Sequence, residues 1–246
     1  MSMTTIEDRL HEAFTAPLDE VVDAERRCAF PADPVGSWDL PADDRAALLR
    51  WGLPTDIALR PAPQPGREPL LVPNLAGPQE RRLASPGQRL YDLGRWGGSG
   101  ATPRIGAVAG DGRVLAVRDR PVTAADLPLP LRGIYRDLYR PAVAYLNASV
   151  ARFVEVAWRW SAAAGPLREL TEPPVPGTRA ELLERHGSAE RAAAVMSAWE
   201  DAADAHLERA RDCERRALAG VRAVDPTIGP GGAESLWLEA VYDRPC

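Results

Sequence analysis

The stretch that decides the fold is Ile105-Gly106-Ala107-Val108-Ala109-Gly110-Asp111-Gly112-Arg113-Val114-Leu115-Ala116-Val117. Its two ends are short apolar runs of the kind that form buried strands. The residues between them, 109–112, combine glycine and aspartate, which tolerate the positive φ angles of a tight turn. The stretch therefore predicts a β-hairpin.

Similar short apolar runs, separated by turn residues, extend this pattern toward the N-terminus. They lie at residues 57–59, 70–72 and 90–93. Together with the hairpin they predict four or five strands in an antiparallel sheet. The proline-rich pieces at 61–69 and 121–130 are expected to be loops.

Helices are predicted before the sheet. Thr4 or Thr5 can cap a first helix whose apolar residues recur every four positions. A second helical stretch is expected over residues 18–30. A third, over residues 41–51, carries two aspartates in its first turn and is expected to end at Gly52.

Helices are also predicted after the sheet. Asn147 or Ser149 is expected to cap the first of them. Residues 178–181, Thr-Arg-Ala-Glu, form a capping box. Residues 188–220 predict a long helix with one apolar stripe and an opposite face dense in charged residues. The order of helices, sheet and helices indicates the α+β class.

The composition is that of a globular protein, with 45% hydrophobic and 26% charged residues in 246. All 30 basic residues are arginine, and the net charge is -5. An acidic balance argues against binding to a nucleic-acid backbone, and no basic strand carries interleaved aromatic residues. The acidic net charge suits a basic protein partner.

The cysteines indicate a reducing compartment. Cys28, Cys213 and Cys246 are far apart and form no CxxC pair, so neither a disulfide framework nor a zinc ribbon is expected. No apolar run resembles a signal peptide or is long enough to cross a bilayer. We therefore expect a cytoplasmic protein without a membrane partner.

A search for catalytic or metal-binding residues finds no motif. His11, His186 and His206 are isolated, and His206 lies on the apolar stripe of the long helix, where a core or interface role is favoured. The glycine-rich residues 97–100 lead to Thr-Pro and a strand, whereas a phosphate loop leads into a helix. We expect no catalytic residue, no cofactor and no metal.

Four segments occur in an order that resembles one protein family. They are Leu40-Pro41 with residues 48–54, residues 90–94 with residues 105 and 112–114, residues 146–150 with Phe153, and Val224-Asp225-Pro226 with Trp237. The family is the fourth branch of the SUKH superfamily of bacterial immunity proteins (SUKH-4). Ala148 and Val150 depart from the serine and leucine that the family has at this helix start.

The resemblance implies a SUKH-like mixed, largely antiparallel sheet flanked by helices, with a long C-terminal helical segment. It places an N-terminal helical segment at residues 1–37 and the SUKH-like domain at residues 38–246, with a helical insertion near 178–220. It implies a non-catalytic immunity protein that binds and neutralises a toxin, of the nuclease or nucleotide-modifying type. The family has no catalytic residues to transfer.

The binding face is expected in the loop at residues 95–102 and on the acidic surface. The candidate partner-binding residues are Trp96, Arg95, Asp111 and Asp92, because interface energy concentrates in tryptophan and arginine. Trp96 has an alternative role as a core residue at a strand end.

Two other functions are compatible with the sequence. The chain could be a scaffold or regulatory subunit of a larger assembly, with the long helix as its contact. It could also be an enzyme whose site is built from scattered Asp, Arg and His residues, since fold alone does not fix function. The sequence predicts no oligomeric state.

Overall fold

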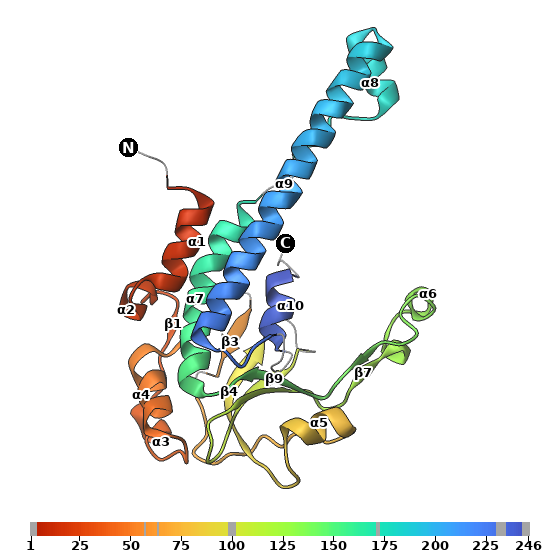
Figure 1. Ribbon diagram of the computed structural model, residues 1–246. Coiled ribbons are helices and arrows are strands. Elements are labelled where there is room, and N and C mark those ends of the chain that lie inside the picture. The colour runs from red at the N-terminus through yellow and green to blue at the C-terminus, as the bar shows by residue number, and fades with distance from the viewer. Residues whose placement is uncertain are drawn as a thin grey trace.

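The protein is an α+β protein built on one five-stranded antiparallel sheet. The computed structural model describes residues 4–56, 58–62, 64–97, 102–170, 173–229 and 235–242. In Figure 1, helices α1, α7 and α9 lie side by side above the sheet, and α5 lies below it. The predicted fold class is confirmed.

The sheet has the strand order β3-β4-β5-β6-β9, and every neighbouring pair in it is antiparallel. The predicted hairpin is its centre. Gly110 and Gly112 adopt φ angles of 92° and 74° in the turn, which explains the glycines there. The strands are β3 (Leu59–Pro61), β4 (Leu90–Trp96), β5 (Arg104–Val108), β6 (Val114–Val117) and β9 (Val143–Asn147).

Two details of the sheet differ from the sequence pattern. Residues 70–72 do not form a strand, because only Leu71 bridges the sheet, opposite Leu90. The edge strand β9 was not predicted. It pairs with β6 across a long intervening segment, and such non-local pairing leaves no local signal.

The N-terminal helices agree with the prediction in part. Helix α1 (Ile6–Thr15) begins at Thr5, which forms a capping box with Asp8. Helix α4 (Ala42–Trp51) ends at Gly52, whose φ is 61°. Helix α3 (Ala32–Val35) is a single turn between them.

The expected helix over residues 18–30 is wrong beyond its first turn. Helix α2 (Leu18–Val21) is short, and the chain then forms β1 (Arg27–Cys28), which pairs with β2 (Leu53–Pro54). Gly52 permits this pairing, because a Cβ there would lie 2.3 Å from the Cys28 carbonyl oxygen. The tertiary contact with β2 overrides the local helical pattern.

The C-terminal helices begin where the caps were predicted. Ser149 caps α7 (Val150–Arg168), the capping box at Thr178 starts α8 (Arg179–His186), and Ser188 caps α9 (Ala189–Val224). Helix α10 (Leu236–Tyr242) packs against α9 and β9.

Helix α9 is about 54 Å long at 1.5 Å per residue and has two distinct halves. Its C-terminal half packs on α1, α7 and α10. Its N-terminal half contacts α8 and projects from the body of the protein with it (Figure 1). The predicted stripe is therefore fully buried at Ala192 and from Ala210 onward, whereas His206 between them is partly exposed and Ala202 is exposed.

Helix α1 belongs to the same core as the sheet layer. Leu10 and Ala13 are buried, and the Glu7 carboxylate forms a 2.7 Å ion pair with Arg209 on α9. This pair lowers the pKa of Glu7 to about 2. The division of the chain near residue 37 stays a prediction.

The segment expected as a loop at 121–130 is largely ordered secondary structure. It belongs to an arm, residues 121–140, that extends away from the sheet between β6 and β9 (Figure 1). The arm consists of a two-stranded ribbon with helical turns at its end: β7 (Val122–Thr123), η1 (Ala124–Asp126), α6 (Leu129–Arg132) and β8 (Tyr139–Arg140).

Candidate functional site

A groove with a volume of about 790 Å³ opens at the β9 edge of the sheet. Helix α5 (Pro78–Leu83), the base of the arm, β9 and α10 surround it. We call it the arginine groove. Its charged lining residues are Arg82, Arg118, Arg140 and Glu239.

On one side of the groove, a buried carboxylate fixes α5 to the arm. Glu80 is fully buried and accepts hydrogen bonds from the Tyr139 hydroxyl, at 2.8 Å, and from the Ala142 amide, at 3.0 Å. Burial alone raises the pKa of Glu80, but hydrogen bonds from backbone amides and from Tyr139 outweigh it, so the pKa lies below its usual value. Glu80 is therefore an ionised structural group.

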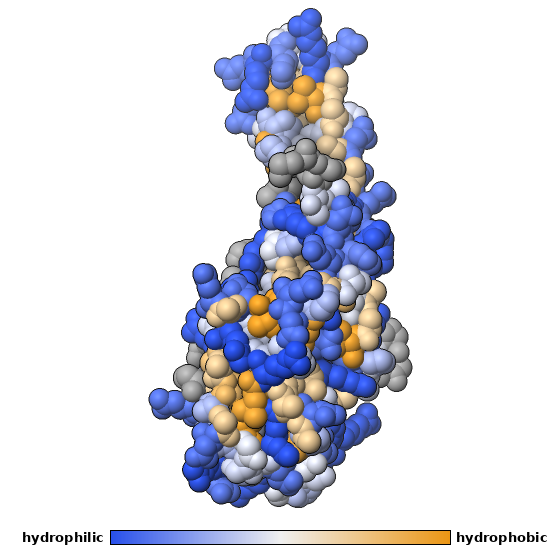
Figure 2. All heavy atoms as spheres, turned by 90° about the vertical axis from the view of Figure 1, so that its left-hand side faces the viewer, coloured by the Kyte–Doolittle hydropathy of each residue, from blue (hydrophilic) through white to orange (hydrophobic). Residues whose placement is uncertain are grey.

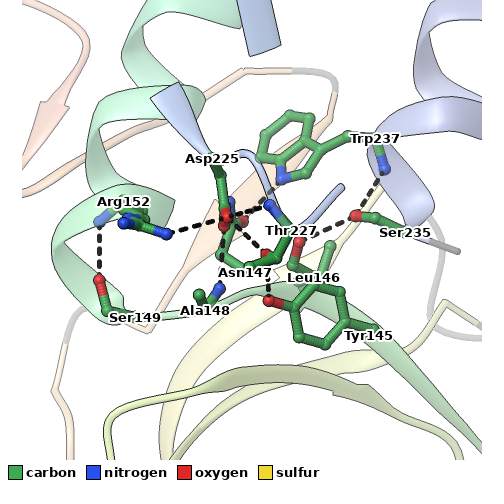
Figure 3. Close-up of polar contacts among 10 residues, drawn as sticks. All are labelled: Tyr145, Leu146, Asn147, Ala148, Ser149, Arg152, Asp225, Thr227, Ser235 and Trp237. Atoms are coloured by element: carbon green, nitrogen blue, oxygen red, sulfur yellow. Dashed lines mark hydrogen bonds and ion pairs between the residues drawn. The ribbon is translucent and has the colours of Figure 1, made fainter. Parts of the chain in front are cut away.

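On the other side, a second buried carboxylate fixes the end of α9 to β9 and α7 (Figure 3). Asp225 is fully buried and accepts hydrogen bonds from Asn147 Nδ2, at 3.0 Å, and from the Ala148 amide, at 2.9 Å. It also accepts from the Thr227 amide and pairs with Arg152. These partners satisfy both of its oxygens.

The same network holds α10 in place (Figure 3). The Trp237 indole donates to Asn147 Oδ1 at 2.8 Å, and the Ser235 hydroxyl donates to the Leu146 carbonyl at 2.9 Å. Ser235 and its neighbours Leu236, Leu238 and Glu239 line the groove. The Asp225 network therefore positions one complete wall of the arginine groove.

The electrostatics of the groove centre on Arg118. Its side chain lies partly buried at the end of β6, and burial lowers its pKa despite the opposing effect of Glu239. Its hydrogen bond to the Pro141 carbonyl is 3.4 Å long, and no carboxylate in the described ranges pairs with it. Arg140, by contrast, approaches Glu239 at 3.4 Å.

The arm beside the groove exposes an unusual amount of apolar side chain. Leu129, Ile134 and Tyr135 are 75%, 72% and 52% exposed. With Leu131 and Tyr139, the arm carries five of the ten large exposed hydrophobic residues in the described part of the chain. Clusters of this kind on a soluble protein mark interaction surfaces.

The four partner-binding residues predicted from the sequence do not form one patch. Asp92, Arg95 and Trp96 lie on β4, while Asp111 lies in the hairpin turn at the opposite end of the sheet strands. Asp92 pairs with Arg104, and Asp111 pairs with Arg113. The rest of the predicted binding loop, residues 98–101, lies outside the described residues.

Trp96 packs edge-on against the buried Trp237, with ring centroids 4.7 Å apart. It is partly buried and contacts the core, which is the alternative role that the sequence left open. Partner binding by Trp96, Arg95, Asp111 and Asp92 stays a prediction.

The groove and the arm were not found from the sequence. Arg118 and Arg140 stand far from each other and belong to no motif, and the sequence predicts a loop at residues 121–130, the first half of the arm. The sequence does contain one signal of the arm. Its large apolar residues stand in a segment without strand or helix periodicity, so no predicted strand or helix would bury them. They are Leu129, Leu131, Ile134 and Tyr135.

The described residues contain no arrangement suited to metal or thiol chemistry. No group of three or more His, Cys, Asp or Glu side chains among them is placed to hold a metal ion. Burial raises the pKa of Cys28 and Cys213, which keeps both as thiols. Across the same ranges, no helix has the length and apolar character needed to span a membrane.

The fold and the groove thus define an α+β protein in which a helix-covered antiparallel sheet supports a surface groove and an apolar arm. A model of the SUKH-4 immunity protein family matches residues 14–243, which is nearly the whole chain. The chain belongs to the SUKH-4 immunity protein family. No curated protein and no solved structure matches it.

Proposed function

We propose that the protein is a non-catalytic immunity protein that binds a toxin in the cytoplasm and neutralises it by covering part of its surface. The toxin is of the nuclease or nucleotide-modifying type, as the family resemblance implies. The observation that supports the proposal best is the apolar arm. An isolated soluble protein gains nothing by exposing Leu129, Ile134 and Tyr135 together, whereas a partner surface would remove them from water.

The experiment is neutralisation of a candidate toxin encoded near this gene. Wild-type protein should restore growth of cells that express the toxin and should form a stable complex with it in gel filtration. Replacing Leu129, Ile134 and Tyr135 together by serine should abolish both effects. The side chains are exposed, so the unfolding midpoint should stay close to that of the wild type.

A matched control uses exposed apolar residues elsewhere. Leu183 on α8 and Leu207 on α9 are 46% and 47% exposed. Replacing both by serine should leave rescue intact. Failure of the wild-type protein to rescue cells from any such toxin would count against the function itself.

A second candidate function is that of a scaffold or regulatory subunit. The projection formed by α8 and the N-terminal half of α9 favours it, because it reaches away from the body. Figure 2 shows apolar residues gathered near the tip of this projection. In that case the serine variants of Leu183 and Leu207 would lose a co-purifying assembly that contains no toxin, and the arm variant would keep it.

A further inference from the structure

We propose that the arginine groove receives an acidic, extended segment of the partner, whose carboxylates pair with Arg118 and Arg140. This inference rests on the proposed function, because it assigns the partner's chemistry at one surface of an immunity protein. It departs from the basic partner that the net charge of the whole chain suggests. A partner segment responds to the charge of the surface that it contacts, and the charge of the arginine groove is positive.

The first argument is the charge of the groove. The chain as a whole is acidic, with a net charge of -5. The groove is lined by Arg82, Arg118 and Arg140 against a single acid, Glu239. Opposite charge on a partner segment would steer it to this part of the surface and would suppress binding of basic segments.

The second argument is the state of Arg118. A partly buried guanidinium carries a desolvation cost that a carboxylate partner repays. Within the described part of the chain, the Arg118 guanidinium makes only a long hydrogen bond, to the Pro141 carbonyl. Its planar group can hold a carboxylate through two parallel hydrogen bonds, which is the geometry that arginine favours.

The third argument is the fixed placement of Arg118. The Arg118 amide donates to the Ala142 carbonyl at 2.7 Å, and Val117 lies opposite Val143. This pairing holds the start of the Arg118 side chain against β9, whose Val143 lines the groove. Val143 is fully buried and Tyr145 is bridged to Ser235, so the groove offers an entering segment side chains and not a free strand edge.

The fourth argument is continuity with the arm. Tyr139 and Arg140 belong both to β8 of the arm and to the lining of the groove. A partner that covers the apolar arm therefore reaches the groove without a gap. Leu238 on the far wall is partly exposed and offers an apolar contact to an extended segment. A protein segment fits these features better than a small anion does.

The test is selection from a random peptide library displayed on phage, with the full-length protein immobilised at 0.15 M salt. The enriched peptides should carry Asp or Glu residues alternating with apolar ones. A synthetic peptide of the best sequence should bind at least tenfold more weakly to the Arg118→Gln and Arg140→Gln variants. It should bind unchanged to Arg136→Gln, since Arg136 is an exposed arginine of the arm outside the groove.

Arg140 is exposed, so its variant tests the groove even if Arg118→Gln does not fold. The inference would be overturned if no peptide is enriched or if the enriched peptides lack acidic residues. It would also be overturned if the peptide binds the wild type and both arginine variants equally well. Arginine-dependent binding of pyrophosphate, measured by calorimetry without any peptide enrichment, would overturn it in favour of a phosphate ligand. Toxin rescue that persists in both variants would overturn it while the proposed function stands.

Discussion

The hydroxyl of Tyr139 donates a 2.8 Å hydrogen bond to the buried carboxylate of Glu80 and so ties the base of the arm to α5. Across the groove, the buried carboxylate of Asp225 ties the end of α9 to β9 and α7. Each wall of the arginine groove is therefore held by one internal carboxylate. Since neither carboxylate lines the groove, the shape of the site and its charge can be altered separately by mutation.

Replacing Tyr139 by phenylalanine tests the first of these contacts. The variant removes one hydrogen bond to an ionised group and leaves Glu80 with the Ala142 amide. We expect the free energy of unfolding, measured by urea denaturation at pH 7, to fall, because the ionised Glu80 loses a hydrogen-bond donor. The matched control is Tyr135→Phe, since Tyr135 lies on the same arm and is 52% exposed. An equal loss in both variants would contradict the role given to Glu80.

Replacing Asp225 by asparagine tests the second contact. Asparagine would turn an NH₂ group toward donors that now face a carboxylate oxygen, in a fully buried position. We expect the free energy of unfolding to fall by about 3 kcal/mol at pH 7. The loss should include weaker packing of α10, visible as faster amide exchange in residues 235–242.

The effect of Asp225 should depend on pH. Burial by itself raises its pKa, but hydrogen bonds from Thr227, Ala148 and Asn147 lower it below the usual value. A lowered pKa means that the group stabilises the fold above its unfolded pKa of about 4, and that this contribution is lost as the pH falls through the folded pKa. The difference between wild type and Asp225→Asn should therefore shrink below about pH 4. A constant difference from pH 7 to pH 3 would refute this assignment.

The parts of the fold that could be predicted from the sequence are those fixed by neighbouring residues. Thr5, Ser149 and Ser188 cap helices because their side chains reach backbone amides three residues later. The hairpin follows from the glycines of its own turn. By contrast, β1 and β9 exist because they pair with distant segments, and their own residues carry no strand pattern that distinguishes them.

The candidate site could not be predicted from the sequence for the same reason. Arg82 lies on α5, Arg118 directly follows β6, and Arg140 lies on β8, so only the tertiary fold brings them to one groove. Trp96 has the residue type of an interface anchor, and it packs on Trp237 of α10, a contact that leaves its partner-binding role a prediction. Residue type alone does not separate a surface tryptophan from one that packs on a second, distant tryptophan.

Gly112 should be intolerant of a side chain for two separable reasons. Its φ of 74° lies in the left-handed region, and an added Cβ would lie 1.9 Å from the buried Asp44 Oδ2. Asp44 accepts a 2.7 Å hydrogen bond from the Ala151 amide at the start of α7, so moving it also weakens that helix start. We expect Gly112→Ala to lower the free energy of unfolding by about 3–4 kcal/mol.

Gly87 provides the matched control for that variant. Its φ is 80°, but a Cβ would have nothing within 4 Å. Gly87→Ala should therefore cost only the backbone strain, about 1–2 kcal/mol. Thermal unfolding of both variants measures the difference, which is the cost of displacing Asp44. Equal costs would show that Asp44 moves freely.

The projection should unfold independently of the body of the protein. Leu182 of α8 is fully buried, as is Ala192 of α9, and α8 contacts α9, so the larger Leu182 side chain fills most of the interior between them. Leu182→Ala removes about 2–5 kcal/mol of packing there. We expect amide exchange in residues 179–200 to accelerate at least tenfold, whereas β5 and β6 keep their protection. The neighbouring Leu183, which is 46% exposed, should give no such change when replaced by alanine. Loss of protection in β5 and β6 of the Leu182 variant would instead mean that the projection and the sheet unfold as one cooperative unit.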